Sequence, residues 1–368
     1  MSQPRFTPLV QTLPATVPFV GPEQQERDRG AEFAARLGAN ESMFGPSPRA
    51  VEAMTAAASE VWKYADPSCH DLREALARHY GVPAASVLVG EGIDGILGNL
   101  ARLVIGAGDA VVTSNGAYPT FNYHVAGFGG TLHKVDYNGD HGDLPALITK
   151  AAEVDAKLIY FANPDNPMGS WVEGAAIEAA LDALPQGTLL ALDEAYVELA
   201  PDGTAPRIDP NDPRIFRLRT FSKAYGMAGA RIGYGIGAPD LIQSFDKIRN
   251  HFGVNRVAQA GALAALQDDA WLTHVQAQVA ASRDRLTEIA MQNGLTALPS
   301  ATNFVTIDCG RDGDTARAVL ADMIAQGVFV RMPFVAPQDR CIRVGCGPKD
   351  AMDAVAATLP HALSRAGR

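Results

Sequence analysis

One stretch of this sequence decides how the rest is interpreted: Thr220-Phe221-Ser222-Lys223-Ala224-Tyr225-Gly226-Met227-Ala228-Gly229-Ala230-Arg231, directly after the strand-like residues 215–218. A lysine amine can form a Schiff base with an aldehyde when a pocket lowers the pKa of the amine, and Lys223 is the candidate. Ser222 and Arg231 flank this lysine at spacings that could converge on one phosphate. The small residues between them let the backbone approach a ligand. Taken alone, the stretch also fits a surface lysine in a glycine-rich turn.

Around this stretch, from about residue 50 to 250, short apolar runs alternate with amphipathic helical stretches. The apolar runs are residues 87–89, 110–112, 158–161, 189–192 and 232–234, and the helical stretches include residues 71–80, 94–105 and 177–184. Continuous apolar strands separated by helices predict an α/β fold with a parallel sheet buried on both faces. In such sheets ligands bind beyond the carboxyl ends of the strands, and several polar clusters of this sequence lie there.

The pattern changes near residue 255, where a smaller α+β domain is predicted. It comprises a long helical stretch at 258–293, strands at 303–307, 328–330 and 341–344, and helices near 315–326 and 349–363. Residues 1–30 are rich in proline and polar groups without any period, which indicates an extended arm or, alternatively, a disordered tail. We therefore divide the chain into the arm (1–30), a segment joining the small domain (31–50), a large domain (51–252) and a small C-terminal domain (253–368).

Composition narrows the functional class. A chain of 368 residues is too long for one small core, and its net charge of -10 argues against nucleic acid or an anionic membrane as the main partner. The four cysteines form no CxxC pair and have no zinc-like spacing, so we expect reduced thiols and no metal site. Residues 1–20 lack a signal-peptide pattern, and no apolar run reaches the roughly 20 residues of a membrane span. These features predict a cytoplasmic enzyme.

A carboxylate lies at the end of a buried strand, in Leu192-Asp193-Glu194-Ala195-Tyr196. Burying a carboxylate is costly unless it is paired. A protonated pyridine nitrogen is such a partner, and an aspartate beside it keeps the ring an electron sink. Tyr196 could hydrogen-bond a hydroxyl on the same ring. The alternative is an aspartate that caps the next helix.

Three further clusters follow predicted strands. Residues 163–169 (NPDNPMG) form a rigid loop that can present the Asn166 amide to a ring oxygen. Residues 90–95 (GEGIDG) precede a helix, so they offer free amides and a positive dipole end to a phosphate. Residues 118–121 (YPTF) supply an aromatic ring that can stack on a planar cofactor. Each of these clusters alone also fits an ordinary turn or core packing.

Two arginines, Arg331 and Arg343, lie on late predicted strands. Arg343 stands among apolar neighbours in Cys341-Ile342-Arg343-Val344. An arginine on a half-buried strand needs an anion, and its planar fork fits a carboxylate or a phosphate. A structural salt bridge is the alternative interpretation.

In this order, the six clusters resemble the fold-type I aminotransferases that depend on pyridoxal 5'-phosphate (PLP), and most closely the histidinol-phosphate aminotransferase group. That group also has a stretch like Asn40-Glu41 with Gly45-Pro46-Ser47-Pro48, and a tyrosine like Tyr64. The likeness covers roughly residues 18 to 347, and the runs 193–196 and 222–231 are specific. It implies a large PLP-binding domain with a mixed, mostly parallel seven-stranded sheet, a smaller α+β C-terminal domain, and a homodimer with shared active sites.

The resemblance implies a role for each matching residue. Lys223 would hold PLP as a Schiff base and move the proton between the substrate α-carbon and C4' of the cofactor, while Asp193 would pair with the pyridinium nitrogen. Arg343, Arg331 and Asn40 would contact the substrate. The other implied contacts are Tyr196 and Asn166 to the ring hydroxyl oxygen, Phe121 (with Tyr118 as the alternate) stacked on the ring, and Ile93, Asp94, Thr220, Ser222, Arg231 and the partner subunit's Tyr64 at the phosphate.

The implied reaction is transamination with ping-pong kinetics. The amino donor would be an amino acid, expected to be L-glutamate, and the acceptor a 2-oxo acid or an imidazole-acetol-phosphate-like ketone. A decarboxylase, such as a threonine-phosphate decarboxylase-like enzyme, or a racemase on the same scaffold would use the same residues and is the alternative. A PLP-sensing regulator would need a DNA-binding module, for which residues 1–30 are too few and the net charge is wrong.

Three places differ from the pattern of the group. Pro18-Phe19 lacks an aromatic hydroxyl that the group often has near the substrate phosphate. Asp165 and Met168 replace the asparagine and the threonine of the usual Asn-Asn-Pro-Thr-Gly, and Gly95 stands where an acidic residue is common. None of these positions touches the PLP chemistry, but they leave the substrate open.

Overall fold

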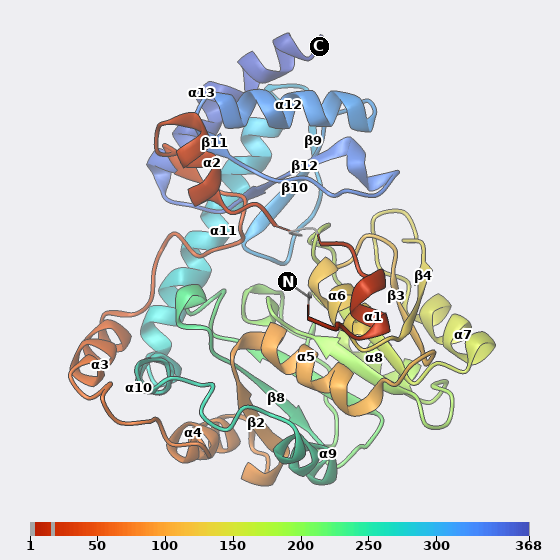
Figure 1. Cartoon of the computed structure of the whole chain (residues 1–368). Coiled ribbons are helices and arrows are strands. Elements are labelled where there is room, and N and C mark those ends of the chain that lie inside the picture. Colours follow the sequence, from red (N-terminus) through yellow and green to blue (C-terminus); the bar gives the residue numbers. More distant parts are fainter. Residues whose placement is uncertain (1–3, 16–18, 368) are drawn as a thin grey trace.

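A seven-stranded sheet forms the centre of the larger part of the molecule in the computed structural model, which describes residues 4–15 and 19–367 (Figure 1). The strand order is β2-β8-β7-β6-β5-β3-β4. β8 is antiparallel to both of its neighbours, and the other pairs are parallel, which confirms the mixed, mostly parallel sheet. The strands are β2 Val87–Gly90, β3 Ala110–Ser114, β4 Thr131–Val135, β5 Leu158–Ala162, β6 Leu189–Asp193, β7 Ile215–Thr220 and β8 Gly233–Gly237.

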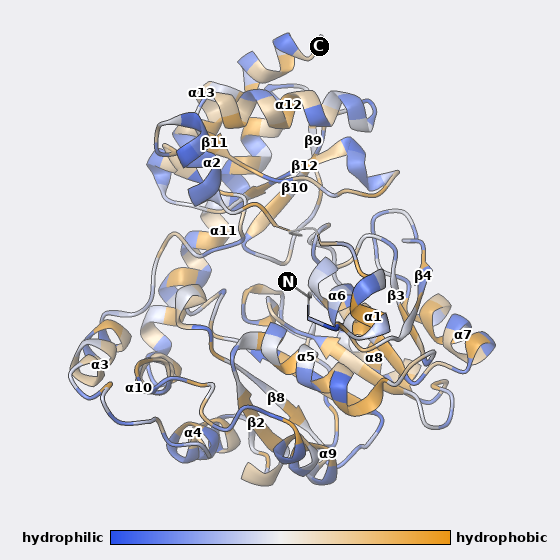
Figure 2. Ribbon diagram, in the orientation of Figure 1, coloured by the Kyte–Doolittle hydropathy of each residue, from blue (hydrophilic) through white to orange (hydrophobic). Residues whose placement is uncertain are grey.

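Helices cover both faces of this sheet because its central strands are apolar on both sides (Figure 2). One face packs against α5 (Gly92–Val104) and α6 (Pro119–Gly127). The other face packs against α7 (Leu144–Val154) and α8 (Gly174–Leu181), and towards the β2 edge against α4 (His70–Tyr80). The polar loops at the carboxyl ends of β3, β5, β6 and β7 are therefore left to form a site, as the sequence predicts.

The smaller part of the molecule is an α+β unit. Its antiparallel sheet has the order β12-β10-β9, and β1 pairs in parallel with β11 as a separate two-stranded sheet. An apolar core holds these strands against long helices. The elements are β1 Ala35–Arg36, β9 Thr296–Ala297, β10 Phe304–Asp308, β11 Val328–Phe329 and β12 Cys341–Gly345, with α11 Asp269–Gln292, α12 Gly313–Ala325 and α13 Lys349–Arg365. Through β1, the segment at 31–50 contributes a strand to this part.

The single helical stretch predicted at 258–293 is wrong, because the structure has two helices there. α10 (Arg256–Leu266) ends at Gln267, and α11 begins after Asp268, whose carboxylate accepts a hydrogen bond from the Trp271 amide. An aspartate in that position caps a new helix rather than continuing the old one. α10 packs on α3 (Pro48–Ala58) and α4, which lie in the larger part of the molecule.

The extended arm predicted for residues 1–30 is also corrected. The described part of the arm contains two short helices, α1 (Pro8–Thr12) and α2 (Pro22–Arg29). Each begins with proline at its first position, where the missing amide costs nothing. α2 consists of polar residues, so it has no apolar period for sequence analysis to detect. Residues 1–3 and 16–18, including the Pro18 discussed above, lie outside the described residues.

A search of the described residues for a helix long and apolar enough to cross a membrane finds none.

Candidate active site

A cavity of about 380 Å³ lies where the carboxyl edge of the large sheet meets the smaller part and the N-terminal arm. The strand ends bring together residues that are far apart in the sequence. Almost every predicted site residue lines this cavity: Asn40, Ile93, Asp94, Tyr118, Asn166, Asp193, Tyr196, Thr220, Ser222, Lys223, Arg231, Arg331 and Arg343. Phe19 of the arm lines it as well.

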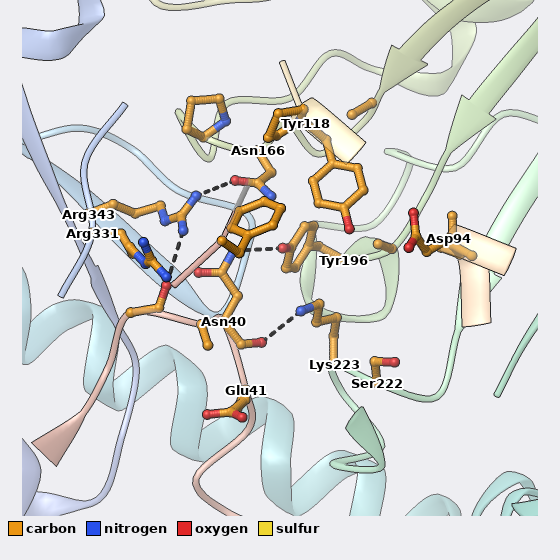
Figure 3. Close-up of a pocket in the computed structure, with 18 of the residues that line it drawn as sticks. Asn40, Glu41, Asp94, Tyr118, Asn166, Tyr196, Ser222, Lys223, Arg331 and Arg343 are labelled. Atoms are coloured by element: carbon orange, nitrogen blue, oxygen red, sulfur yellow. Dashed lines mark hydrogen bonds between the residues drawn. The ribbon is translucent and has the colours of Figure 1, made fainter. Parts of the chain in front are cut away.

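Lys223 projects into this cavity from the loop after β7 (Figure 3). Its Nζ donates a hydrogen bond to the Asn40 carbonyl at 3.0 Å. Burial, reinforced by the Arg343 cation, lowers the pKa of Lys223 to about 8. A larger share of the amine is therefore neutral and nucleophilic near neutral pH than in a surface lysine, which is what capture of an aldehyde requires.

Asp193 is the last residue of β6, lines the cavity and is only 6% exposed. Its Oδ2 accepts a hydrogen bond from the Tyr160 hydroxyl at 2.7 Å, and its Oδ1 accepts one from the Ala195 amide at 3.0 Å. Burial raises the pKa of Asp193 to about 6 despite these donors. No arginine or lysine of the described residues donates a hydrogen bond to this carboxylate. A buried carboxylate of this kind can pair with a cationic ring nitrogen in the cavity.

A cradle for an anion lies at the N-terminus of α5. Ile93 and Asp94 occupy the first turn of this helix, where backbone amides have no partner within the helix. The Arg231 guanidinium packs against Gly92, whose φ is +75°. A Cβ added to Gly92 would lie 2.5 Å from Arg231 Nη2. Thr220 and Ser222 add two hydroxyls 2.9 Å apart. These groups fit a phosphate.

Tyr196, Asn166 and Asn40 form a polar wall of the cavity (Figure 3). Asn40 Nδ2 donates to the Tyr196 hydroxyl oxygen at 2.9 Å, and Arg343 donates to Asn166 Oδ1. The Asn166 amide nitrogen is then left to face a ligand. The Asn40 Oδ1 is buried without a hydrogen-bond partner in the described structure, so it is also available to a ligand.

Arg343 and Arg331 lie next to each other, because their backbones form a short antiparallel bridge. Arg343 donates to the Gly38 carbonyl at 3.2 Å, and Arg331 donates to the Val20 carbonyl of the arm at 2.6 Å. Among residues 4–15 and 19–367, neither guanidinium has a carboxylate within ion-pairing distance. Burial lowers the pKa of Arg343 to about 10 and also lowers that of Arg331. The alternative interpretation, a structural salt bridge, is therefore not found among the described residues, and both cations are available to bind an anionic ligand.

The two aromatic candidates for ring stacking differ in position. Phe121 is fully buried, does not line the cavity, and stacks instead on Tyr160 with ring centroids 4.6 Å apart. Tyr118 lines the cavity and points into it (Figure 3). The prediction that Phe121 faces the site is therefore wrong, because the first turn of α6 directs residue 121 into the core, and of the two candidates the alternate, Tyr118, lies at the cavity.

Tyr64 lies outside the cavity of its own chain. Its side chain is 80% exposed, and its ring packs on Phe252 at 4.8 Å.

Tyr160 and Asn303 were not predicted from the sequence as residues of the site. Tyr160 is a fully buried tyrosine inside an apolar strand, and its hydroxyl needs a partner there, which was a usable signal. Asn303 donates to the Asn40 and Glu41 carbonyls at 3.1 and 3.2 Å and so supports the turn that carries Asn40. No local sequence pattern marks that role, since these residues are far apart in the chain.

Comparison with known proteins agrees with this geometry. Residues 35–359 match the family aminotransferase class I and II. A crystal structure of histidinol-phosphate aminotransferase from Sinorhizobium meliloti in complex with pyridoxal-5'-phosphate is 53% identical, with a TM-score of 0.95 and coverage of 99% of this chain and 98% of that chain.

Two curated relatives carry the same name. The histidinol-phosphate aminotransferase of Anaeromyxobacter sp. (strain Fw109-5) is 38% identical over 89% of this chain and 90% of its own length. That of Moorella thermoacetica is 32% identical over 94% of this chain and 90% of its own length. With a cavity that supplies a lysine, a carboxylate and an anion cradle for PLP, this chain belongs to the class I and II aminotransferases and is a PLP-dependent transaminase.

Proposed function

We propose that this transaminase moves an amino group from L-glutamate to an imidazole-acetol-phosphate-like ketone, in the manner of a histidinol-phosphate aminotransferase. The observation that carries the proposal is the pair of half-buried guanidiniums, Arg343 and Arg331, which face the cavity beside Lys223 without a carboxylate partner among the described residues. Glutamate has two carboxylates and the ketone has a phosphate, so two adjacent cations suit both substrates. The names of the relatives point to the same reaction.

The residues that hold the cofactor follow from the cavity. When bound, PLP acts as an electron sink for the α-carbon of the substrate. The Lys223 amine would hold the cofactor through its aldehyde carbon and would serve as the base that moves the substrate proton. Asp193 would pair with the protonated ring nitrogen, and Tyr196 and Asn166 would bind the ring hydroxyl oxygen. Tyr118 would contact one face of the ring.

The phosphate of the cofactor is held by charge and by hydrogen bonds. The amides of Ile93 and Asp94 point from the N-terminus of α5, where the helix dipole favours an anion. The hydroxyls of Thr220 and Ser222 and the Arg231 guanidinium complete this cradle. The cradle and Lys223 line the same cavity, so one cofactor molecule could contact both.

Substrate contacts come mainly from the smaller part of the molecule. Arg343 binds the α-carboxylate of the amino donor through its planar fork, which is already oriented by the Gly38 carbonyl and by Asn166. Arg331 binds the second anionic group, the side-chain carboxylate of glutamate or the phosphate of the ketone. Asn40 offers its unpaired Oδ1 on the same side of the cavity.

The experiment that tests this function treats each half-reaction separately. L-Glutamate added to the PLP-loaded enzyme should bleach the near-ultraviolet to visible band of the bound cofactor and release 2-oxoglutarate. Histidinol phosphate should bleach the same band. If histidinol phosphate at millimolar concentration leaves the band unchanged while glutamate bleaches it, the assigned acceptor is wrong, although the transaminase stands. Aromatic amino acids then become the next substrates to screen.

We also propose that the chain is a homodimer, with Tyr64 reaching the cofactor phosphate of the partner subunit. An apolar patch of four exposed side chains supports this: Val61, Trp62, Tyr64 and Phe252, which are 63, 77, 80 and 51% exposed. Apolar patches of this kind mark interaction surfaces. A tyrosine inside such a patch can contact the neighbouring chain rather than its own cavity.

Replacing Trp62 by glutamate is expected to dissociate the dimer, because the new charge would be buried without a partner at the interface. Analytical ultracentrifugation should show the wild type at twice the mass of one chain and the variant at the mass of one chain. The matched control is Met291→Glu on α11, where an apolar side chain that is 70% exposed lies outside the patch. A Trp62→Glu protein that still sediments as a dimer would contradict this interface.

Tyr64→Phe isolates the second half of the proposal. It should keep the dimer intact and raise the Kd for PLP by roughly tenfold, the value of one hydrogen bond to a charged group.

We propose a cytoplasmic location. Cys69, Cys341 and Cys346 are buried free thiols, which suits a reducing compartment.

A further inference from the structure

The carboxylate of Asp193 is held by a tyrosine that the known chemistry of the site does not use. Tyr160 donates its hydroxyl to Asp193 Oδ2 at 2.7 Å, while the Ala195 amide donates to Oδ1 at 3.0 Å. Among the described residues, Tyr160 is the only side chain that hydrogen-bonds to Asp193. With one donor on each oxygen, the two hydrogen bonds fix the orientation of the carboxylate.

Two independent features hold Tyr160 itself in place. It is the middle residue of β5, paired in register with Ala191 of the neighbouring β6, and it is 1% exposed. Its ring stacks on Phe121 of α6, with a centroid separation of 4.6 Å and an angle of 17° between the rings. The hydroxyl therefore lies at a position set by the sheet and by a helix, and it reaches the cavity wall.

We propose that Tyr160 is a positioning residue of the transamination reaction, which acts through Asp193 to keep the proton on the ring nitrogen of PLP. Phe121, which was predicted to stack on the cofactor, has the indirect role of holding Tyr160. The inference rests on the proposed pairing of Asp193 with that nitrogen.

The physical reason is a competition for one proton. In a buried pair, the proton can stay on the ring nitrogen beside a carboxylate anion, or move to give a neutral acid beside a neutral pyridine. Burial favours the neutral pair, as the raised pKa of Asp193 shows. A hydroxyl that donates to the carboxylate stabilises the anion more than the neutral acid, so Tyr160 shifts the balance towards the protonated ring.

Other charges near Asp193 also affect its protonation, but they do not replace the hydrogen bond from Tyr160. Lys223 favours the Asp193 anion and Glu194 disfavours it. Burial and then the Asp193 carboxylate raise the pKa of Tyr160 well above its ordinary value, with smaller contributions from Tyr118 and Asp165, so this hydroxyl stays protonated as a donor at physiological pH.

The test is Tyr160→Phe, measured on enzyme loaded with PLP that carries ¹⁵N in its ring. The ring nitrogen of the wild type should show the chemical shift of a protonated pyridine, and that of the variant should move towards the unprotonated value. The Kd for PLP should rise by less than about tenfold, the value of one hydrogen bond to a charged group, because the Tyr160–Asp193 bond also forms without the cofactor. We also expect kcat to fall about tenfold with KM for glutamate changed less than about twofold, because the lost interaction does not touch the substrate.

Tyr234→Phe is the matched control. Tyr234 is another fully buried strand tyrosine in a hydrogen bond, 2.6 Å from the Tyr80 hydroxyl, but it does not line the active-site cavity. Its removal should lower the melting temperature without moving the ¹⁵N shift or the Kd for PLP. If both tyrosine variants leave the ¹⁵N shift at the wild-type value, Tyr160 has no positioning role and the inference is overturned.

Two further variants keep the result interpretable. Phe121→Leu retains the Tyr160 hydroxyl but removes its stacking partner, so it should move the ¹⁵N shift in the same direction by a smaller amount, even if Tyr160→Phe proves too unstable to study. Asp193→Asn separates this inference from the function on which it rests. A ¹⁵N shift that responds to Asp193→Asn but to neither Tyr160→Phe nor Phe121→Leu rejects Tyr160 alone, whereas one that ignores Asp193→Asn rejects the proposed Asp193 pairing.

Discussion

Replacing Lys223 by alanine is expected to remove the near-ultraviolet to visible absorption band of the bound cofactor and to lower kcat by at least about 10⁴-fold. The variant loses both the covalent anchor and the base that carries the proton, and a positioned base alone contributes about 10²- to 10⁴-fold. PLP should still bind, because the phosphate cradle at α5 is intact. The measurements are an absorption spectrum after reconstitution and a coupled assay with glutamate.

Lys157→Ala is the matched control for this variant, since that lysine pairs with Asp109 on the surface and is 52% exposed. It should keep both the band and the activity. A Lys223→Ala enzyme that retains the band would show that another amine holds the cofactor, and the assignment of Lys223 would be wrong.

The pH dependence of cofactor capture follows from the same residue. Only the neutral amine attacks an aldehyde, and the pKa of Lys223 in the chain without cofactor is about 8. The rate of PLP capture by the cofactor-free enzyme should therefore rise as the pH rises through about 8 and level off above it. A surface lysine would give a rise near pH 10.4 instead.

The second large effect is expected for Arg343→Gln. Removing one partner of a buried, hydrogen-bonded charge pair costs about 2 to 5 kcal/mol, so kcat/KM for glutamate should fall by roughly 30- to 5,000-fold. Glutamine keeps a hydrogen-bond donor near Asn166 but has no charge for the α-carboxylate. Because Arg343 does not form part of the phosphate cradle, the Kd for PLP should change little. Stopped-flow titration of the cofactor band with glutamate measures the effect.

Arg317→Gln provides the matched control in the same part of the molecule. Arg317 pairs with Asp314 and Asp339 at the surface and is 53% exposed, a kind of contact that contributes about 0 to 1 kcal/mol. It should leave kcat/KM within about twofold of the wild type. If Arg343→Gln behaves like Arg317→Gln, the substrate carboxylate binds elsewhere, and Arg331 becomes the first residue to test.

Local sequence patterns were sufficient for six of the seven strands of the large sheet and for the residues directly after them, whereas β4 and the two-residue strands β1 and β9 were not predicted. The runs that became β5, β6 and β7 are continuous and apolar because both of their faces are covered, and Asn166, Asp193 and Lys223 follow or end them. Since parallel strands share one carboxyl edge, these residues were expected to meet, and the cavity contains all three. The pattern failed at α1 and α2, where helices form without an apolar stripe.

Periods and turns within a few residues therefore predicted the α/β class, and the family resemblance of the motifs predicted the roles of the lysine, the carboxylate and the glycine-rich helix start. The tertiary structure was needed to show that Tyr118 rather than Phe121 lines the cavity, that Arg343 and Arg331 lack acidic partners among the described residues, and that Tyr160 hydrogen-bonds to Asp193. These facts depend on where side chains far apart in the chain come to lie. These positions are set by packing between helices, sheet and arm, and they cannot be predicted from a local period in the sequence.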